Sequence, residues 1–322
     1  MAVKAKELSW SLSKARTFEE CPRRYYLHHY LAKWGYSPDA PEDARRALEM
    51  RSIKGLDMWV GEVVHSTIQW ALEQIRDGTP PPGEAQACEE ARRRLSEGWM
   101  ASQKRLWRTQ PEEGHPNLFD HYYGIPWQKA TTDRLKTKAF TSLKNFFNSP
   151  VFRRIADTSP DKWLPIEKYS AFRLDGILFY LKFDFAMKDG QGIRVYDWKT
   201  GNPSPSECRQ LACYAMYTSG KWEVPLSDIH VSAVHLQPEF SSDDRLVDED
   251  DIIETKSFVR QSFDGMVKCL RNPARDIAVM ADFSTTGNYL RCARCNFRGL
   301  CEQGIQATGS IEDTPIPEDW DG

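Results

Sequence analysis

The sequence has no apolar run long enough to cross a membrane, and its N-terminus, MAVKAKELSW, has no hydrophobic core of the kind found in signal peptides. It also has no G-x-x-x-x-G-K-[ST] loop, no helicase motif and no internal repeat. These absences argue against a membrane-bound part, a nucleotide-driven motor and a repeat architecture in this chain. We therefore expect a cytoplasmic protein.

Positive charge is missing from the end of the chain and concentrated elsewhere. No lysine or arginine follows Cys301, whereas basic residues are frequent near the N-terminus and again between Lys129 and Arg154. The net charge is −3, so the composition allows either a basic surface on a slightly acidic protein or charged faces that only contact water. At 322 residues, the chain can form one large domain or two small ones.

A second C-x2-C pair is absent, which argues against a standard zinc ribbon. The segment RCARCNFRGLC instead places Cys292, Cys295 and Cys301 close together, and cysteines in a cytoplasmic chain favour metal binding or catalysis over disulfides. Cys21, near the other end of the chain, is the best candidate for a fourth thiolate. This three-plus-one arrangement favours an iron–sulfur cluster, with zinc as the alternative. Either metal would join the two ends of the chain.

Helical periodicity dominates the first half of the chain. Apolar or small residues recur at steps of three and four from Met58 to Ile75, and His65 falls on this stripe. A lone histidine on such a face is usually a core residue, so it becomes a candidate ligand only if its helix packs against an acidic site. Further helices are expected over residues 22–35, 84–107, 133–150, 204–222 and 251–272.

The hydrophobic period changes from helical to alternating after Pro165. Three β-rich runs, residues 166–174, 177–187 and 193–199, are separated by glycine-bearing turns and predict a β-meander. A further strand is expected over 229–237, and the acidic segment SSDDRLVDEDD after it is expected to be a loop. This order of elements predicts an α/β or α+β protein, in which helices flank a β-sheet core.

Counting residues outward from the two turns brings three carboxylates together. If residues 175–176 and 190–191 form two-residue hairpin loops, Asp184 lies directly opposite both Glu167 and Asp197. Opposed side chains lie about 5 Å apart, so like charges there destabilise a sheet unless a cation is present. Such a row suits Mg²⁺ or Mn²⁺, which prefer oxygen ligands. The simpler alternative is an edge hairpin whose acidic side chains contact water.

The stretch VYDWKTG also places a lysine beside these acids. Because side chains alternate along a strand, Lys199 shares a face with Asp197, while Trp198 points to the opposite face with Phe183 and Phe185. A lysine in this position can orient attacking water and stabilise negative charge on a phosphoryl group. The alternative is an ordinary surface ion pair.

Gln210 and Tyr214 lie on one face of the helix that follows, because they are four residues apart. Both could reach the same phosphate backbone. Residue pairs with this spacing are more often packing or surface residues, so the pattern is weak evidence alone.

Six segments, taken in order, resemble motifs of the PD-(D/E)XK nuclease superfamily, in its RecB-like branch. They are SWSLSKARTFEECPRRYYL, GEVVH, KFDFAM, YDWKTG, QLACY and the final C-x2-C-x5-C. This branch contains the nuclease domains of AddB and RecB and the RecB-like CRISPR-associated nucleases. The resemblance implies a restriction-endonuclease-like mixed sheet flanked by helices. One departure is Lys182, at a position where many members have glycine.

The resemblance also implies roles for individual residues. The family's divalent metal, Mg²⁺ or Mn²⁺, is bound at the positions of His65, Asp184 and Asp197, and its lysine at Lys199 assists the attack of water. The assignment of Glu167 to the family's active site rests mainly on counting residues outward from the turns. Family positions that contact DNA correspond to Gln210 and Tyr214. The family's [4Fe-4S] cluster is held at the positions of Cys21, Cys292, Cys295 and Cys301.

The implied activity is hydrolysis of DNA phosphodiester bonds, with exonuclease action on single strands or free ends. It would serve DNA repair, recombination or antiviral defence, with a helicase or other partner supplied separately. Two alternatives remain: an inert DNA-binding subunit with a structural cluster, and a zinc-stapled nuclease that acts on RNA.

We expect four parts along the chain. They are an N-terminal segment with the first cluster cysteine (1–57), a helical region with His65 (58–160), the nuclease core (161–272), and a cluster-binding segment with an acidic tail (273–322).

Overall fold

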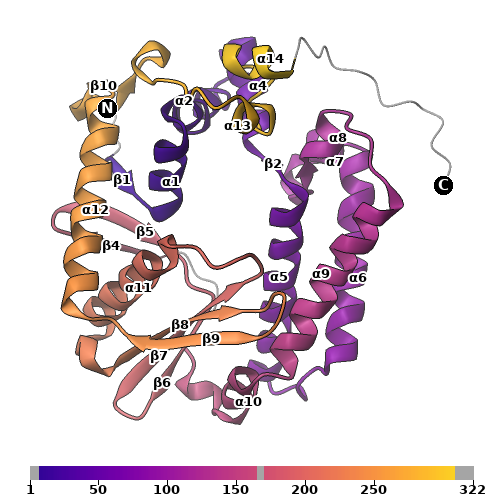
Figure 1. Cartoon of the computed structure of the whole chain (residues 1–322), viewed down its shortest axis with the longest axis vertical. Coiled ribbons are helices and arrows are strands. Elements are labelled where there is room, and N and C mark those ends of the chain that lie inside the picture. Colours follow the sequence, from indigo (N-terminus) through magenta and orange to yellow (C-terminus); the bar gives the residue numbers. More distant parts are fainter. Residues whose placement is uncertain (1–6, 165–169, 309–322) are drawn as a thin grey trace.

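The computed structural model describes residues 7–164 and 170–308. Helices make up most of the first half of this part of the chain, and strands are concentrated in the second half (Figure 1). The helices are α1 (Leu12–Glu20), α2 (Pro22–Tyr26), the π-helical turn η1 (Leu27–Leu31), α3 (Ala32–Trp34), α4 (Glu42–Arg51), α5 (Leu56–Arg76), α6 (Glu84–Gln103), α7 (Leu106–Thr109), α8 (Phe119–Tyr122), α9 (Lys129–Phe147), α10 (Pro150–Asp157), α11 (Ser206–Trp222), α12 (Glu249–Lys268), α13 (Tyr289–Ala293) and α14 (Glu302–Thr308). The strands are β1 (Ser9–Trp10), β2 (Ile53–Lys54), β3 (Asn117–Leu118), β4 (Ser170–Leu174), β5 (Ile177–Leu181), β6 (Phe185–Asp189), β7 (Gly192–Lys199), β8 (Ile229–His235), β9 (Ser241–Leu246), β10 (Leu270–Asn272) and β11 (Ile277–Ala278).

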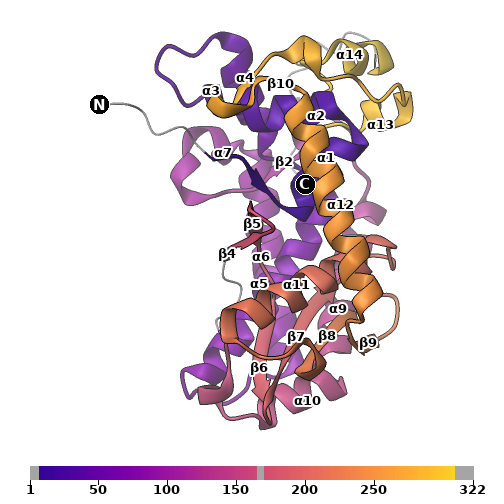
Figure 2. The same cartoon turned by 90° about the vertical axis from the view of Figure 1, so that its left-hand side faces the viewer.

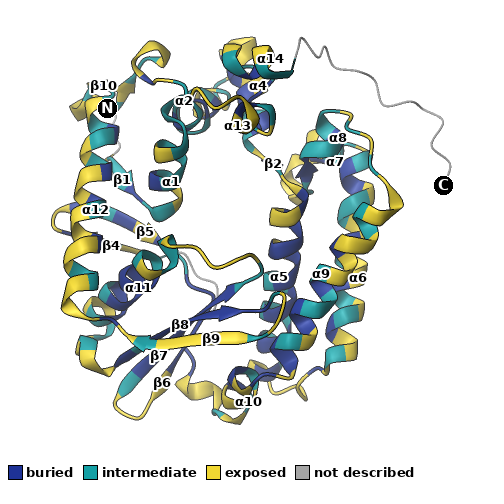
Figure 3. Cartoon of the chain, viewed as in Figure 1, coloured by how far each residue is buried: buried dark blue, intermediate teal, exposed yellow. Residues whose placement is uncertain are grey.

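A mixed sheet of β6, β7, β8 and β9, in that order, forms the centre of the fold. Strands β7 and β8 are parallel, and both outer pairs are antiparallel. Helix α11 supplies the crossover that parallel neighbours require. Figure 3 shows that β7 and β8 are largely buried, whereas β9 is an exposed edge. The mixed sheet with helices on both faces confirms the fold class predicted from the sequence.

Side chains of β7 alternate between two hydrophobic cores. Tyr196 and Trp198 face the core formed with α5, α6 and α9, where the ring of Trp198 lies 5.0 Å from that of Phe146. Val195 packs into the second core, beneath α11 and α12. This period of two places Asp197 on the α11 side of the sheet, opposite Trp198 as predicted.

The predicted β-meander is wrong in its middle run. Both two-residue turns form as expected, and Phe185 packs with Trp198. However, residues 177–187 form two strands in different sheets, because β5 pairs with β1 and β4 while β6 joins the central sheet. The chain leaves the strand conformation between them. Phe183 therefore packs near Tyr217 of α11, with 6.0 Å between the ring centres, and not with Trp198.

The segment predicted to be an acidic loop is also different, because residues 241–246 form β9 antiparallel to β8. Its acidic side chains have partners from other strands. Asp244 accepts hydrogen bonds from Nη1 of Arg194 at 2.6 Å and from Oγ of Ser232 at 3.0 Å. Arg245 pairs with Asp251 of α12, and the exposed Asp243 faces water, which is usual for an edge strand that must not pair with another chain.

The two ends of the described chain lie side by side at one end of the molecule, where α13 and α14 adjoin the N-terminal helices (Figures 1 and 2). The backbone N–H of Arg23 donates to the carbonyl of Ser284 at 2.9 Å, and its Nε donates to the carbonyl of Phe283 at 2.9 Å. Nδ2 of Asn296 donates to the carbonyl of Met50 at 2.8 Å. Within the described ranges, no helix is both long and apolar enough to span a membrane.

Candidate active site

Asp184 and Asp197 face each other at one end of the β6–β7 hairpin. The last regular pair, Phe185 with Tyr196, sets this register, because the next residues outward are the two aspartates. Both are buried, with 7% and 4% of their surfaces exposed. Turn counting therefore predicted the placement of this pair correctly. Glu167 lies outside the described residues, so its place in the row stays a prediction.

Asp184 is held from two sides. The backbone N–H of Trp198 donates to Oδ2 at 2.6 Å, and Nδ1 of His65 lies 3.1 Å from Oδ1. His65 reaches this carboxylate from α5, which approaches the end of β7 closely: a Cβ added at Gly61 would lie 2.9 Å from Oγ1 of Thr200. The missing side chain of Gly61 lets the helix come near the strand. Because the helix of His65 packs against an acidic site, His65 is a candidate metal ligand.

Asp197 is enclosed by three side chains. Lys199 forms an ion pair with Oδ2, while Nε2 of Gln210 donates to Oδ1 at 3.2 Å and the hydroxyl of Tyr214 lies 3.0 Å from Oδ1. Lys199 also donates to Oε1 of Gln210 at 2.7 Å, which closes the network. Oδ2 receives no well-directed hydrogen bond within the described chain, so the charge of Lys199 is its main compensation.

Tyr214 links this network to the backbone. Its hydroxyl accepts from Nε2 of Gln210 at 2.6 Å and has two acceptors within reach, the carbonyl of Lys182 at 2.9 Å and Oδ1 of Asp197. Burial, and then the negative charges of Asp197 and Asp184, raise the pKa of Tyr214 well above its ordinary value. The hydroxyl therefore stays protonated at neutral pH and can orient Asp197 as a donor.

A cleft of about 470 Å³ opens in front of Asp184. One wall is a face of α5 that includes Met58, Gly61 and His65, and the other wall includes Lys182 and Asp184. The sequence predicted that Met58 belongs to an apolar core stripe, but its side chain is 61% exposed. The reason is that this face of α5 enters the core only after His65 along the helix, where the helix packs on the sheet.

An ion pair near Lys199 was missed by the sequence-based predictions. Nε2 of His235 lies 3.2 Å from Oε2 of Glu207, and both side chains are almost fully buried. His235 stands beside Lys199 in the register of β7 and β8. No local signal marks this pair, because it depends on how α11 aligns the two parallel strands.

The profile of the PD-(D/E)XK nuclease superfamily matches residues 9–302. The chain belongs to this superfamily. Among curated proteins, none matches it significantly. As a PD-(D/E)XK protein, it is related to metal-dependent nucleases that cleave phosphodiester bonds, and the matched range includes the N-terminal helices as well as the sheet.

The carboxylate centre of this PD-(D/E)XK chain has donor types that suit a divalent ion, since carboxylate oxygens and an imidazole nitrogen lie together. In the part of the chain that the structure describes, no group of three or more His, Cys, Asp or Glu side chains has a metal-binding arrangement. The oxygens of Asp184 and Asp197 are instead turned toward protein partners. The chemical types of these donors therefore suit Mg²⁺ or Mn²⁺. In this structure, the carboxylate oxygens contact protein groups.

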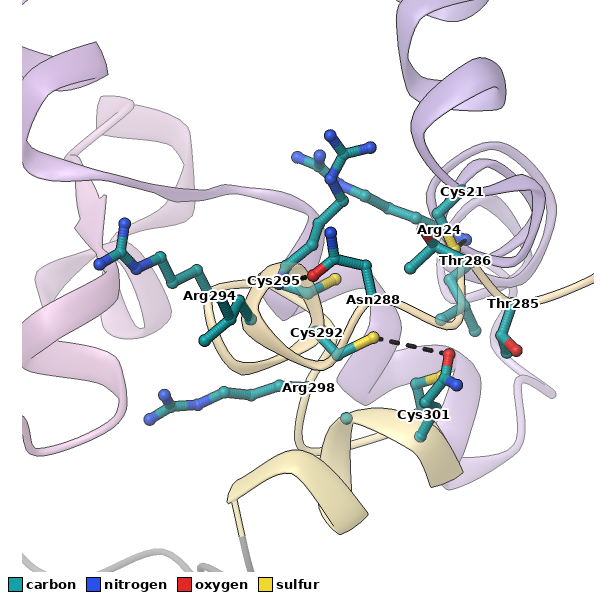
Figure 4. A pocket seen from close by; sticks show the side chains of 15 residues that line it. Cys21, Arg24, Thr285, Thr286, Asn288, Cys292, Arg294, Cys295, Arg298 and Cys301 are labelled. Carbon is teal, nitrogen blue, oxygen red and sulfur yellow. Dashed lines mark hydrogen bonds between the residues drawn. The ribbon is translucent and has the colours of Figure 1, made fainter.

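The four cysteines predicted as cluster ligands line one pocket of about 400 Å³ between the two ends of the chain. Figure 4 shows Cys21 on the N-terminal side and the other three on the C-terminal segment, around the same space. None of the chain's cysteines forms a disulfide. Four arginines also line this pocket: Arg24, Arg291, Arg294 and Arg298.

The thiols of this pocket have weak protein partners. Sγ of Cys292 lies 3.6 Å from Oε1 of Gln303, and Sγ of Cys295 lies 3.9 Å from Oδ1 of Asn296. Burial raises the pKa of the Cys295 thiol to about 11, although the backbone N–H of Phe297 opposes this shift. The four thiols share one pocket with positive charge, but within the described residues no three of them are arranged to hold a metal, so the cluster stays a prediction.

Proposed function

We propose that the protein is a metal-dependent deoxyribonuclease of the RecB-like branch, which hydrolyses phosphodiester bonds of single strands or at DNA ends. The observation that carries this proposal is the network of Asp184, Asp197 and Lys199 beside an open cleft. Asp184 lines this cleft together with His65, and Asp197 and Lys199 form an ion pair beside Asp184 on the neighbouring strand. Membership in a nuclease superfamily supports the same chemistry.

Mg²⁺ or Mn²⁺ would be held by Asp184, Asp197 and His65, and when bound it supplies Lewis-acid polarisation of the phosphodiester. The chain's own groups have separate tasks. The N–H of Trp198 and the ring of His65 fix the orientation of Asp184. Lys199 brings a positive charge that orients water and stabilises negative charge developing on the phosphate.

Gln210 and Tyr214 are proposed to act first on Asp197. Tyr214 is only 3% exposed, and its hydroxyl is engaged with Asp197, Gln210 and the backbone of Lys182. It therefore serves as a positioning residue that keeps the carboxylate aligned. The contact of both residues with DNA stays a prediction from the family resemblance.

The four pocket cysteines are proposed to hold a [4Fe-4S] cluster. Their convergence from both ends of the chain, together with the surrounding arginines, supports this assignment. An anionic cluster in thiolate ligands is stabilised by nearby positive charge. Its role would be to tie α1 and α2 to the segment around α13.

The activity would belong to DNA repair, recombination or antiviral defence in the cytoplasm. Strand opening would come from a helicase or another partner, because the chain itself has no phosphate-binding loop. Exonuclease action is the form of cleavage that we expect.

The test compares cleavage of end-labelled linear and circular single-stranded DNA with Mg²⁺ or Mn²⁺. Asp197→Ala should abolish cleavage of the linear strand, since it removes the carboxylate between Lys199 and the facing Asp184. The matched control is Asp189→Ala, at the opposite end of the same hairpin, which should keep parental activity. Equal and negligible cleavage by the parent and Asp197→Ala with both metals would leave an inert DNA-binding subunit. Cleavage confined to RNA, with zinc and no iron in the protein, would favour the zinc-stapled alternative.

A further inference from the structure

A second pocket, of about 760 Å³, lies between the N-terminal elements and β5. In Figure 1, β1 and α1 lie above β5, and α5 stands on the opposite side. We call this pocket the basic groove and define it by three cations and two tyrosines: Lys14, Lys33, Arg51, Tyr36 and Tyr180. It shares no lining residue with the cleft in front of the carboxylates.

Two of the three cations of the basic groove, Lys33 and Arg51, are available to a ligand. Within the described residues, Lys33 and Arg51 form neither an ion pair nor a side-chain hydrogen bond. Nζ of Lys14 is held by neutral oxygens of Ser9, at 2.9 Å from the carbonyl and 2.7 Å from Oγ. These contacts orient the ammonium group of Lys14 at the edge of the groove.

Of the two acidic residues that line the groove, only Glu7 is paired with a cation within the described chain. The carboxylate of Glu7 binds Arg173, with 2.7 Å between Oε2 and Nη2. Asp276 accepts a hydrogen bond from the hydroxyl of Tyr30 at 2.8 Å. The groove therefore keeps an excess of positive charge, although the whole chain carries a net charge of −3.

A half-buried histidine, His29, lies where these cations converge. Burial, then His28, and then Lys14, Arg51 and Lys33 lower the pKa of His29 to about 2. Three basic side chains from α1, α3 and α4 thus act on one ring. Their charges are concentrated in one place, as a polyanionic ligand requires.

Aromatic rings stand beside the cations. Tyr36 is 70% exposed and Tyr180 is 42% exposed, and both line the groove. Exposed tyrosines next to lysine and arginine are typical of sites where bases stack while phosphates meet cations.

The groove continues toward the carboxylate centre. On β5 and just after it, Leu178 and Tyr180 line the groove, and Lys182 and Asp184 line the cleft in front of the carboxylates. Tyr180 and Lys182 are only two residues apart in the chain, so the two lining sets are close to each other. On the other side, Arg51 ends α4 shortly before α5 begins to form the cleft wall.

We propose that the basic groove binds a single strand of nucleic acid and leads it to the carboxylate centre. Lys14, Lys33 and Arg51 contact the phosphates, and Tyr36 and Tyr180 stack on bases. This inference rests on the proposed nuclease function. It adds the path that the substrate takes to the carboxylates. It also explains a preference for single strands, because stacking on a ring requires unpaired bases.

The test measures binding of labelled oligothymidine to the full protein by fluorescence anisotropy, with the divalent ions removed by a chelator so that no cleavage occurs. Lys33→Glu/Arg51→Glu should weaken binding at least tenfold at low salt. It should also reduce the slope of log K against log salt by about 1.4, since each phosphate contact to a single strand contributes about 0.7. Tyr36→Ala should weaken binding about tenfold with an unchanged slope.

The matched control is Lys129→Glu/Lys136→Glu, which makes the same change in net charge at exposed residues of α9. It should bind as the parent does, and circular dichroism should show that all variants are folded. Equal affinities for the groove variant and this control would overturn the proposal. So would equal competition by oligothymidine and by polyglutamate of matched charge, because that would indicate an acidic protein partner.

A second readout separates this proposal from the proposed function. Turnover of bis(p-nitrophenyl) phosphate, a small phosphodiester, should be unchanged in Lys33→Glu/Arg51→Glu while DNA binding is lost. If the parent cleaves no phosphodiester but the groove variant still loses DNA binding, the nuclease proposal is wrong and the DNA-binding role of the basic groove is supported. If the parent cleaves DNA and the groove variant binds and cleaves it normally, the groove proposal fails alone.

Discussion

The carboxylate centre and the cysteine pocket differ in what holds their side chains in place. In the carboxylate centre, Asp184 and Asp197 are fixed by the N–H of Trp198 and by side chains from α5 and α11, with heavy-atom distances between 2.6 and 3.2 Å. In the cysteine pocket, Sγ of Cys21 and Sγ of Cys295 each accept a backbone N–H at 3.4 Å, and the contacts of Cys292 and Cys295 with amide oxygens are 3.6 and 3.9 Å. The first site is ordered by the fold, and the second lacks strong protein contacts of its own.

The two regions also differ in how the chain assembles them. The carboxylates belong to one hairpin, so local turns bring them together. The cysteines come from opposite ends of the chain and meet only because α2 and the segment around α13 pack together. We therefore expect that metal at the carboxylates governs chemistry, whereas a cluster at the cysteines governs the stability of the joined ends.

The largest effect on stability should come from the cysteine pocket. Cys301→Ser should remove iron and sulfide from the purified protein and lower the free energy of unfolding by more than about 4 kcal/mol, which is typical of losing a structural metal. Iron and sulfide analysis and denaturant titration would measure both losses. Cys208→Ser, an exposed cysteine outside the pocket, should change neither. Retained stability after iron loss would contradict the structural role.

The next effect should come from Lys199→Met at the carboxylate centre. Without a divalent ion, this change leaves Asp197 buried without its main compensating charge and should destabilise the protein by roughly 3 kcal/mol. Added Mg²⁺ should restore the stability, but cleavage should stay 10² to 10³-fold below the parent. Thermal unfolding with and without Mg²⁺ separates the two readouts.

The control for this variant is Lys188→Met, an exposed lysine on the same hairpin. It should keep both stability and cleavage. If Mg²⁺ does not restore the stability of Lys199→Met, the carboxylates do not bind the ion as proposed.

A smaller effect should follow from Tyr214→Phe, which removes the hydroxyl that contacts Asp197 and the backbone of Lys182. Because a hydrogen bond to a charged group contributes about 1.5 to 3 kcal/mol, kcat should fall by about tenfold to a hundredfold. KM for DNA should not change, since Tyr214 acts through Asp197. Tyr217→Phe, on the same helix, is the control and should keep the parental kcat. An increase in KM without loss of kcat would instead support direct DNA contact by Tyr214.

The sequence was most informative where structure depends on neighbouring residues. The turns at 175–176 and 190–191 are specified by glycine and aspartate at their loops, and from them the opposition of Asp184 and Asp197 follows by counting. The helix of His65 was likewise predicted from its periodicity.

The sequence was less informative where distant segments decide the outcome. The split between β5 and β6 depends on β1, which adds to β5 from the far N-terminus. The strand β9 looked like a loop because Arg194 and Ser232, which bind its Asp244, lie elsewhere in the chain. The ion pair of Glu207 and His235 depends on the alignment set by α11.

The last difference between the two regions should appear on mild acidification. Burial, and then Arg51 and Arg24, lower the pKa of His28 to about 4 from an ordinary value of 6.5. His28 lies next to the cysteine pocket, with its ring 6.3 Å from that of Phe297. Above pH 6.5, both folded and unfolded chains hold this histidine neutral, so the full stability is present. Between pH 6.5 and 4, the unfolded chain takes up a proton that the folded chain does not, so stability falls.

Hydrogen exchange at pH 7 and pH 5 should therefore show the segments around Cys21 and Cys295 losing protection before the β6–β7 hairpin does. His28→Gln should reduce the loss of stability over this range by about 2 kcal/mol, because it removes one linked proton. Denaturant titration of this variant at both pH values provides the measurement, and the pH 7 values give the reference. If the hairpin that carries Asp184 and Asp197 loses protection first, the carboxylate centre is the less stable of the two regions. The expected difference between the regions would then be wrong, because the stability of the fold would depend on metal at the carboxylates.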